Sequence, residues 1–236
     1  MNLILLFSDD FIDDGKCVRL SGRRFEHVRK VHRVAVGDEL CVGLCGGLIG
    51  TGRVTVLNEK VLEMNVAFRS YPPLPLPVTL ALALPRPIML KRVLASATSM
   101  GVKRIILFHS HRVEKSFWKS PALNEAHIKE QLILGLEQAK DTLLPTVELK
   151  PLFKPFVEDD LPAMAKDTLC LVAHPESADP CPSNVAGPVT LVVGPEGGLI
   201  PYEIEKLRSL GFLSVHLGKR ILRVETAVPA LLSKLF

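Results

Sequence analysis

The chain has 236 residues and 25.9 kDa, with 29 Lys and Arg against 25 Asp and Glu, so its formal net charge is +4. Hydrophobic residues make up 47% and charged residues 23%, which is typical of a soluble globular protein with a core that needs no disulfide or metal. The mild basic excess is compatible with nucleic-acid binding but does not establish it.

Neither a membrane span nor a secretory signal is expected. The N-terminal MNLILLFSDDF lacks a basic region and its apolar run is short, so we interpret it as a first strand. The five cysteines are scattered and form no CxxC pair, which favours reduced thiols over a zinc site. These features predict a cytoplasmic protein with no metal.

The first 71 residues predict a small β-rich barrel or half-barrel with one helix. Glycines at 46, 47, 50 and 52 supply turns or bulges between short apolar runs. Strands are expected at 3–7, 16–20, 39–44, 48–57 and 61–68, and a helix at 22–32.

A proline-rich stretch then separates two parts of the chain. YPPLPLP, Tyr71–Pro77, holds four prolines in six residues, which excludes a helix or an inner strand. We therefore predict domains at 1–71 and 78–236, joined by a stiff linker at 72–77.

The second domain alternates apolar strands with helices, which predicts an α/β fold with a parallel sheet. Strands are expected at 78–84, 104–108, 169–173, 189–193 and 213–217. Helices are expected at 91–100, 122–139, 202–210 and 226–236.

Unusual sequence follows three of these strands. One ends in His174-Pro175-Glu176, the next in Gly-Pro-Glu-Gly-Gly at 194–198, and the last in a basic segment at 218–226. In open α/β sheets, ligands bind beyond the carboxyl ends of the strands. The three loops therefore predict one pocket.

The GPEGG loop has two interpretations from its residues alone. It is either a tight structural turn or a loop whose glycines let a ligand approach the backbone. No GK[ST] follows and the spacing is not GxGxxG, so neither a Walker A loop nor a dinucleotide fingerprint is present. Glu196 is expected to contribute to the loop structure, near amides at a helix N-terminus, rather than to catalysis.

The segment LGKRILRVETAVPALL is more specific. It places three cations within five residues, with the apolar Ile221 and Leu222 between them, and Thr226 is positioned to cap the last helix. A basic loop leading into a helix is the simpler interpretation, but it does not account for the apolar pair.

Together, GPEGG and LGxRILRxETA resemble the bacterial 16S ribosomal RNA (uridine-N3)-methyltransferase family of the SPOUT superfamily. The resemblance extends through HVRKVHRVAVGDEL at 27–40 and MGVKRIILFHSHR at 100–112, and so covers most of the chain. The chain departs from the family at Ser99-Met100, where Glu-Leu is usual, and at Ala139–Asp141, where a Gly-Arg pair is usual.

The resemblance implies a parallel sheet with a C-terminal trefoil knot, preceded by a PUA-like RNA-binding barrel. It implies that the knotted loops bind S-adenosylmethionine largely through backbone groups, with Ile221 and Leu222 flanking the adenine. The cofactor-binding residues are then Leu171, Ala173, His174, Val193, Gly194, Glu196, Gly197, Gly198, Leu217, Gly218, Ile221, Leu222 and Thr226. It also implies a homodimer.

A second basic cluster lies in the N-terminal domain. It is either a solvated helix face or a surface that neutralises RNA phosphates, and the resemblance favours RNA. The expected RNA-binding residues are Arg19, Arg23, Arg24, Arg29, Lys30, Arg33 and, after the strand at 104–108, Arg112. Aromatic residues are 6% of the chain, so base stacking is not expected to dominate the N-terminal domain.

Methylation at uracil N3 requires loss of the N3 proton and stabilisation of the resulting anion. Arg223 is predicted to hold the charge on the uracil oxygen, and Glu225 to orient or deprotonate N3. Glu225 also suits a helix N-terminus for electrostatic reasons alone. The alternatives are a SPOUT methyltransferase acting on transfer RNA or a ribose 2′-hydroxyl, and a non-catalytic RNA-binding or ribosome-assembly protein. The expected partner is 16S rRNA or the small ribosomal subunit.

Overall fold

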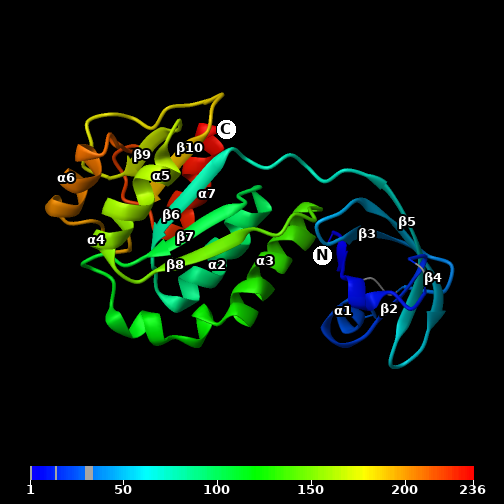
Figure 1. Ribbon diagram of the computed structural model, residues 1–236. Coiled ribbons are helices and arrows are strands. Elements are labelled where there is room, and N and C mark those ends of the chain that lie inside the picture. The colour runs from blue at the N-terminus through cyan, green and yellow to red at the C-terminus, as the bar shows by residue number, and fades with distance from the viewer. Residues whose placement is uncertain (1, 14, 30–33) are drawn as a thin grey trace. The chain divides into compact units, whose positions relative to one another are not determined.

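The computed structural model describes residues 2–13, 15–29 and 34–236, and the chain divides into two compact units (Figure 1). The first unit comprises Met1–Leu74 and Ile133–Leu144, and the second comprises Pro75–Leu132 and Pro145–Phe236. The first unit therefore includes a stretch of twelve residues that the sequence analysis placed in the second domain.

A five-stranded sheet in the order β1-β3-β4-β5-β2 forms the first unit. The β3–β4, β4–β5 and β5–β2 pairs are antiparallel, whereas β1 runs parallel to β3. Phe25, Val28 and Met64 are buried in its core. The elements are β1 (Ile4–Leu6), the 3₁₀ turn η1 (Ser8–Asp10), β2 (Cys17–Leu20), α1 (Gly22–His27), β3 (Glu39–Leu44), β4 (Ile49–Leu57) and β5 (Leu62–Ser70).

Residues 133–144 complete this unit by covering β1. Leu136 is fully buried in a cluster with Leu3 and Leu5. The Glu137 carbonyl accepts hydrogen bonds from the backbone N–H groups of Asn2 and Leu3, each at 3.0 Å. Because β1 alternates its side chains between two faces, Leu3 and Leu5 need this second covering layer while Ile4 and Leu6 face the sheet core.

The second unit is built on a six-stranded sheet in the order β11-β9-β10-β6-β7-β8, in which all neighbouring pairs are parallel. The strands are β6 (Val78–Ala83), β7 (Arg104–Phe108), β8 (Thr146–Lys150), β9 (Leu169–Ala173), β10 (Val189–Val193) and β11 (Leu213–Val215). All five residues of β10 are buried, which requires covering layers on both faces.

Helices and turns connect these strands. Helix α2 packs against α7, whereas α5 packs on β10 and α6 on β11 (Figure 1). The elements are α2 (Pro87–Ser99), η3 (Lys115–Lys119), η4 (Pro121–Leu123), α3 (Glu125–Ala139), α4 (Phe153–Pro155), the π-helical turn η5 (Phe156–Asp160), α5 (Leu161–Ala165), α6 (Pro201–Ser209) and α7 (Val224–Leu235).

In the sheet, β10 lies between β9, the strand that directly precedes it in the chain, and β6, the first strand of this unit. The loop 174–188 is held from two directions. Its Cys181 N–H donates to the His216 carbonyl at 2.8 Å, and its Val185 N–H donates to the Leu235 carbonyl at 2.7 Å. The last helical turn of the chain is therefore bonded to a loop that precedes β10.

Candidate functional site

The loops that follow five strands of the second unit emerge at one edge of its sheet, because parallel strands place their carboxyl ends together. Three of them are the loops predicted to form the pocket, after β9, β10 and β11. The other two, after β6 and β7, form hydrogen bonds with the loop that follows β10.

The GPEGG loop is fixed by contacts on both sides. The Glu196 carboxylate accepts a hydrogen bond at 3.0 Å from the backbone N–H of Arg86, the residue that precedes α2. On the other side, the Arg112 guanidinium donates to the Gly197 carbonyl. Glu196 therefore joins this loop to the N-terminus of a helix 110 residues away, which supports the structural role expected for it.

Two glycines of this loop suit its geometry. Gly198 has φ +74°, a left-handed conformation that residues with a Cβ rarely adopt. At Gly197, an added Cβ would lie 3.1 Å from Cδ of Arg112 and 3.3 Å from its Cβ. The absence of side chains lets Arg112 lie against the loop and leaves the backbone open to a ligand.

A buried carboxylate holds the end of the same loop. Glu203, only 2% exposed, accepts from the Ile200 N–H at 2.9 Å and from the His111 N–H at 2.7 Å. It accepts a hydrogen bond from a backbone N–H at the start of α6 that has no acceptor within the helix, and it also links the loop after β7 to that helix. Sequence reasoning missed Glu203, although an acid three residues after a helix N-cap is a recognisable capping signal.

The loop after β11 carries the exposed apolar pair. Gly218 has φ +115°, and its N–H donates to Nδ1 of His216 at 2.8 Å. Beyond this turn, the side chain of Ile221 is 83% exposed and that of Leu222 is 37% exposed. An apolar pair held in solvent in this way is a candidate contact for a flat apolar ligand such as a purine.

Arg223 and Glu225 flank the start of α7. Arg223 is the exposed N-cap residue, and its carbonyl accepts from the N–H groups of Thr226 at 2.9 Å and Ala227 at 2.7 Å. Glu225 lies in the first helical turn, and its Oε2 atom is buried without a hydrogen-bond partner. A buried carboxylate oxygen with no partner is unusual, and among the described residues Glu137 has one as well. Its place beside the exposed Arg223 makes Glu225 a candidate for contact with a ligand.

The loop after β9 is joined to the loop after β11. The His174 N–H donates to the Val215 carbonyl at 2.9 Å. Val193 is buried at the end of β10, so it can meet a ligand only through its backbone. Leu171 is buried in the middle of β9, between β10 and β11, and so lies away from this edge. The structure thus gathers the predicted cofactor-binding segments at one sheet edge.

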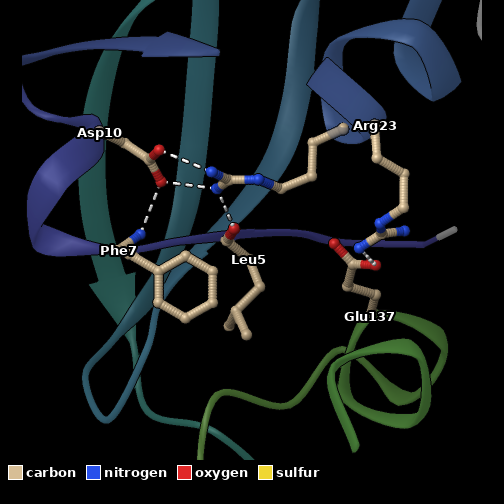
Figure 2. Close-up of polar contacts among 6 residues, drawn as sticks. Leu5, Phe7, Asp10, Arg23 and Glu137 are labelled. Atoms are coloured by element: carbon tan, nitrogen blue, oxygen red, sulfur yellow. Dashed lines mark hydrogen bonds and ion pairs between the residues drawn. The ribbon is translucent and has the colours of Figure 1, made fainter. Parts of the chain in front are cut away.

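Four of the predicted RNA-binding residues, Arg19, Arg23, Arg24 and Arg29, have partners within the first unit. Arg24 donates to both oxygens of Asp10, at 2.6 and 2.7 Å, and to the Leu5 carbonyl at 2.8 Å. Figure 2 shows Asp10, which also accepts from the Phe7 N–H, and Arg23 directed at the Glu137 carboxylate, 3.5 Å away. Only one fifth of the Arg24 side chain is exposed, so it first stabilises this fold.

The other cations of this cluster are more open. Arg19 pairs with Glu63 at 2.8 Å and Arg29 with Glu26 at 3.7 Å, and both arginine side chains are about half exposed. Exposed ion pairs of this kind contribute little to stability, so RNA phosphates can compete for these arginines. Lys30 and Arg33 lie outside the described residues.

Within residues 2–13, 15–29 and 34–236, no cluster of three or more His, Cys, Asp and Glu side chains is placed to hold a metal ion. No helix in the same residues is both long and apolar enough to span a membrane.

Residues 72–236 match the family model described as RNA methyltransferase domain. The chain is 28% identical over 235 residues to the Ribosomal RNA small subunit methyltransferase E of Treponema pallidum, covering 98% of this chain and 88% of the relative. It is 28% identical over 225 residues to the protein of the same name in Synechocystis, covering 92% and 72%. The crystal structure of a Ribosomal RNA small subunit methyltransferase E from Neisseria gonorrhoeae bound to S-adenosyl methionine matches with a TM-score of 0.76 at 25% identity, covering 98% and 95% of the two chains.

Proposed function

Because the chain belongs to the RNA methyltransferase family that its residues 72–236 match, we propose that it methylates N3 of a uridine in the 16S ribosomal RNA of the small subunit, with S-adenosylmethionine as methyl donor. One observation carries the proposal. The loops after β9, β10 and β11 lie at one sheet edge with the exposed Arg223 and the unpartnered carboxylate oxygen of Glu225.

The residues present fit S-adenosylmethionine. Gly197 and Gly198 leave backbone without side chains, and Ile221 offers an apolar surface for the adenine. Leu217, Gly218 and Leu222 extend the same loop, and the methionine part of the cofactor is assigned to the GPEGG side. When bound, the cofactor supplies a methyl group already activated by its sulfonium.

Arg223 and Glu225 perform the two tasks that remain. Neutral uracil N3 carries a proton and is a poor nucleophile, so the carboxylate of Glu225, a half-buried residue, accepts that proton. The lone pair left on N3 would then attack the methyl carbon, while the carbon–sulfur bond would break with its electron pair going to sulfur and S-adenosylhomocysteine leaving. The Arg223 guanidinium stabilises the negative charge that spreads to the uracil oxygens, and positioning by the rigid loops contributes much of the rate.

The proposal includes a knotted second unit, an RNA-binding first unit and a cytoplasmic location. The order of β10 between β9 and β6, and the bonds from the loop 174–188 to the end of α7, support a trefoil knot in the second unit. The five-stranded sheet of the first unit, with its basic α1, supports a PUA-like RNA-binding role. A ribosomal RNA substrate places the enzyme in the cytoplasm.

A homodimer completes the proposal. The apolar side chains of α7 at positions 228, 231, 232 and 235 are buried within their own unit, so they do not form the contact. Ile221 and Ile88, 83% and 60% exposed, are among the exposed apolar side chains that a partner copy or the cofactor would cover. Sedimentation of the free and cofactor-bound protein tests which of the two covers them.

The decisive experiment is mass spectrometry of ribosomal RNA from a strain that lacks this chain. Loss of 3-methyluridine from 16S rRNA, restored by the wild-type chain but not by Arg223→Ala, is the expected result. Intact 3-methyluridine with loss of a transfer-RNA or 2′-O-methyl modification would move the substrate to one of the alternatives. Intact modification together with no cofactor binding in calorimetry would favour a non-catalytic RNA-binding protein.

A further inference from the structure

The segment that follows β7 carries an aromatic and basic surface with no role in the site described above. Its turn η3, Lys115–Lys119, contains the only tryptophan of the chain, Trp118. Phe117 and Trp118 are partly exposed, and Lys115 and Lys119 on either side of them are exposed. Because these aromatics are not fully covered, they can serve as contact surface.

Trp118 is held in place by a histidine. Its Nε1–H donates to Nδ1 of His109 at 2.9 Å, and the two ring centroids lie 6.2 Å apart. An indole N–H can only donate, so His109 accepts at Nδ1 and carries its own proton on Nε2. Burial lowers the pKa of His109 below its usual range, with a smaller opposing effect from Glu203, so the ring is neutral at physiological pH.

This arrangement determines what the pair can offer to a ligand. The single polar atom of the indole is already used, which leaves the ring face of Trp118 and the Nε2–H of His109. A ring whose orientation is fixed in advance binds a flat partner at a lower entropic cost than a mobile one.

The same segment is attached to the candidate cofactor loop. Arg112 hydrogen-bonds Gly197, and the His111 N–H reaches Glu203 at the start of α6. Residues 109–119 contain three Lys and Arg and one acid, Glu114. The aromatic pair therefore lies on a positively charged segment that is hydrogen-bonded to the candidate cofactor loop and to the start of α6.

We propose that His109, Trp118 and the two lysines of η3 form a subsite for an unpaired RNA nucleotide next to the target uridine. The base stacks on the face of Trp118, and Lys115 and Lys119 neutralise the phosphates on either side. Stacking on aromatic side chains and cationic neutralisation of the backbone are how single-stranded RNA is bound. A target that must leave its stack exposes its neighbours, which then need a new surface. The subsite rests on the proposed function, since it assumes an RNA substrate.

Trp118 provides its own signal, because no other tryptophan contributes to the emission. The intact protein, loaded with S-adenosylhomocysteine, is titrated with a short unlabelled oligouridylate while tryptophan fluorescence is recorded. Binding is measured in parallel by the anisotropy of the same RNA carrying a fluorescein label. The expected result is saturable quenching with the same midpoint as the anisotropy change. Emission that stays constant while the RNA binds would overturn the subsite, as would the absence of binding.

Variants separate stacking from other effects. Trp118→Ala should weaken oligouridylate binding about tenfold or more, whereas Trp118→Phe, which retains a ring, should stay within about threefold of wild type. The matched control is Tyr71→Ala, an aromatic that is 87% exposed in the linker region, and its RNA affinity should not change. Cofactor affinity, measured by calorimetry, should be the same in all of them.

The lysines have a separate test. Each phosphate contact to single-stranded RNA contributes about 0.7 to the slope of log affinity against log salt, so Lys115→Ala with Lys119→Ala should reduce that slope by about 1.4. An unchanged RNA affinity in Trp118→Ala would assign the aromatic pair to a protein contact instead. Methyl transfer to 16S rRNA is assayed separately. Methylation of rRNA without fluorescence quenching would contradict the subsite but would leave the proposed function supported.

Discussion

Glu225 is the residue of the candidate site whose environment most directly suggests chemistry, because its Oε2 is buried without a partner next to the exposed Arg223. Helix-dipole stabilisation alone would not require an oxygen to be withdrawn from both water and protein donors. We expect Glu225→Gln to lower the rate of methyl transfer by about 10²- to 10⁴-fold, the usual contribution of a general base. Cofactor affinity should change little, since the substitution preserves size and shape.

The control for this substitution is Glu176→Gln, an exposed carboxylate in the loop after β9. Single-turnover rates with 16S rRNA and calorimetric cofactor affinities are measured for both variants. A Glu225→Gln enzyme with wild-type turnover would remove Glu225 from catalysis and leave it as a helix-terminal carboxylate.

Gly198 is the backbone position where a side chain would be most harmful. At φ +74° an alanine costs about 1–2 kcal/mol, which the loop can avoid only by shifting its backbone. We expect Gly198→Ala to raise the dissociation constant of S-adenosylmethionine about fivefold or more. Gly187→Ala is a matched control, because that glycine has no positive φ and open space around its Cβ position. Equal cofactor affinity in both variants would mean that this loop does not contact the cofactor.

At the level of elements, Glu203 joins the start of α6 to the loop after β7. Glu203→Ala leaves two backbone N–H groups without their acceptor, and each buried unsatisfied group costs about 1–3 kcal/mol. We therefore expect a lower melting temperature and faster amide hydrogen exchange at Ile200 and His111. Glu205→Ala, an exposed acid on the same helix, should show neither effect. Unchanged exchange at both amides would contradict this assignment.

Local sequence patterns predicted the buried elements well. The predictions of 104–108 and 189–193 as strands match β7 and β10, because these buried strands consist mostly of apolar residues. The prediction of 39–44 matches β3, which is bounded by glycines and only partly buried. Strand β8 was missed, since it lies at the sheet edge and carries Glu148 and Lys150, which pair with each other. Helix α2 begins at Pro87 rather than at residue 91, because proline suits the first turn of a helix.

Contacts between distant parts of the chain could not be predicted in this way. Nothing in the local sequence links Glu196 to the N–H of Arg86, or residues 133–144 to the first unit. The three loops of the candidate site were found because parallel topology places all strand ends on one edge. The contacts of Arg112 and Glu203 that hold the loop after β10 depend on tertiary geometry, which the periodicity of the local sequence does not indicate.

At the scale of the whole molecule, a buried carboxylate makes stability depend on pH. Burial raises the pKa of Glu137 above the 4.5 of a free glutamate, and the charge of Arg23 opposes that shift. At pH values between the unfolded and the folded pKa, Glu137 therefore keeps its proton in the folded chain and has lost it in the unfolded chain. The resulting stability is complete below about pH 4.5 and is lost as the pH rises through the folded pKa.

Glu137→Gln, which cannot ionise, should thus gain stability relative to wild type as the pH is raised from about 4 to about 7. The free energy of unfolding is measured in denaturant at several pH values. Glu59→Gln, an exposed acid of the same unit, should follow the wild type throughout. A difference between Glu137→Gln and wild type that does not vary with pH would contradict the raised pKa.

The discontinuity of the first unit has a consequence for how the protein is made. A ribosome releases the chain from its N-terminus, and a unit confined to residues 1–74 could fold as soon as that stretch emerged. Here Leu3 and Leu5 remain uncovered, and the N–H groups of Asn2 and Leu3 remain without the Glu137 carbonyl, until residues 133–144 have emerged from the ribosome. By then β6 and β7 are also outside the tunnel. The nascent chain must therefore carry an incomplete apolar surface through much of its synthesis, which makes it a candidate client for chaperones that act at the exit site.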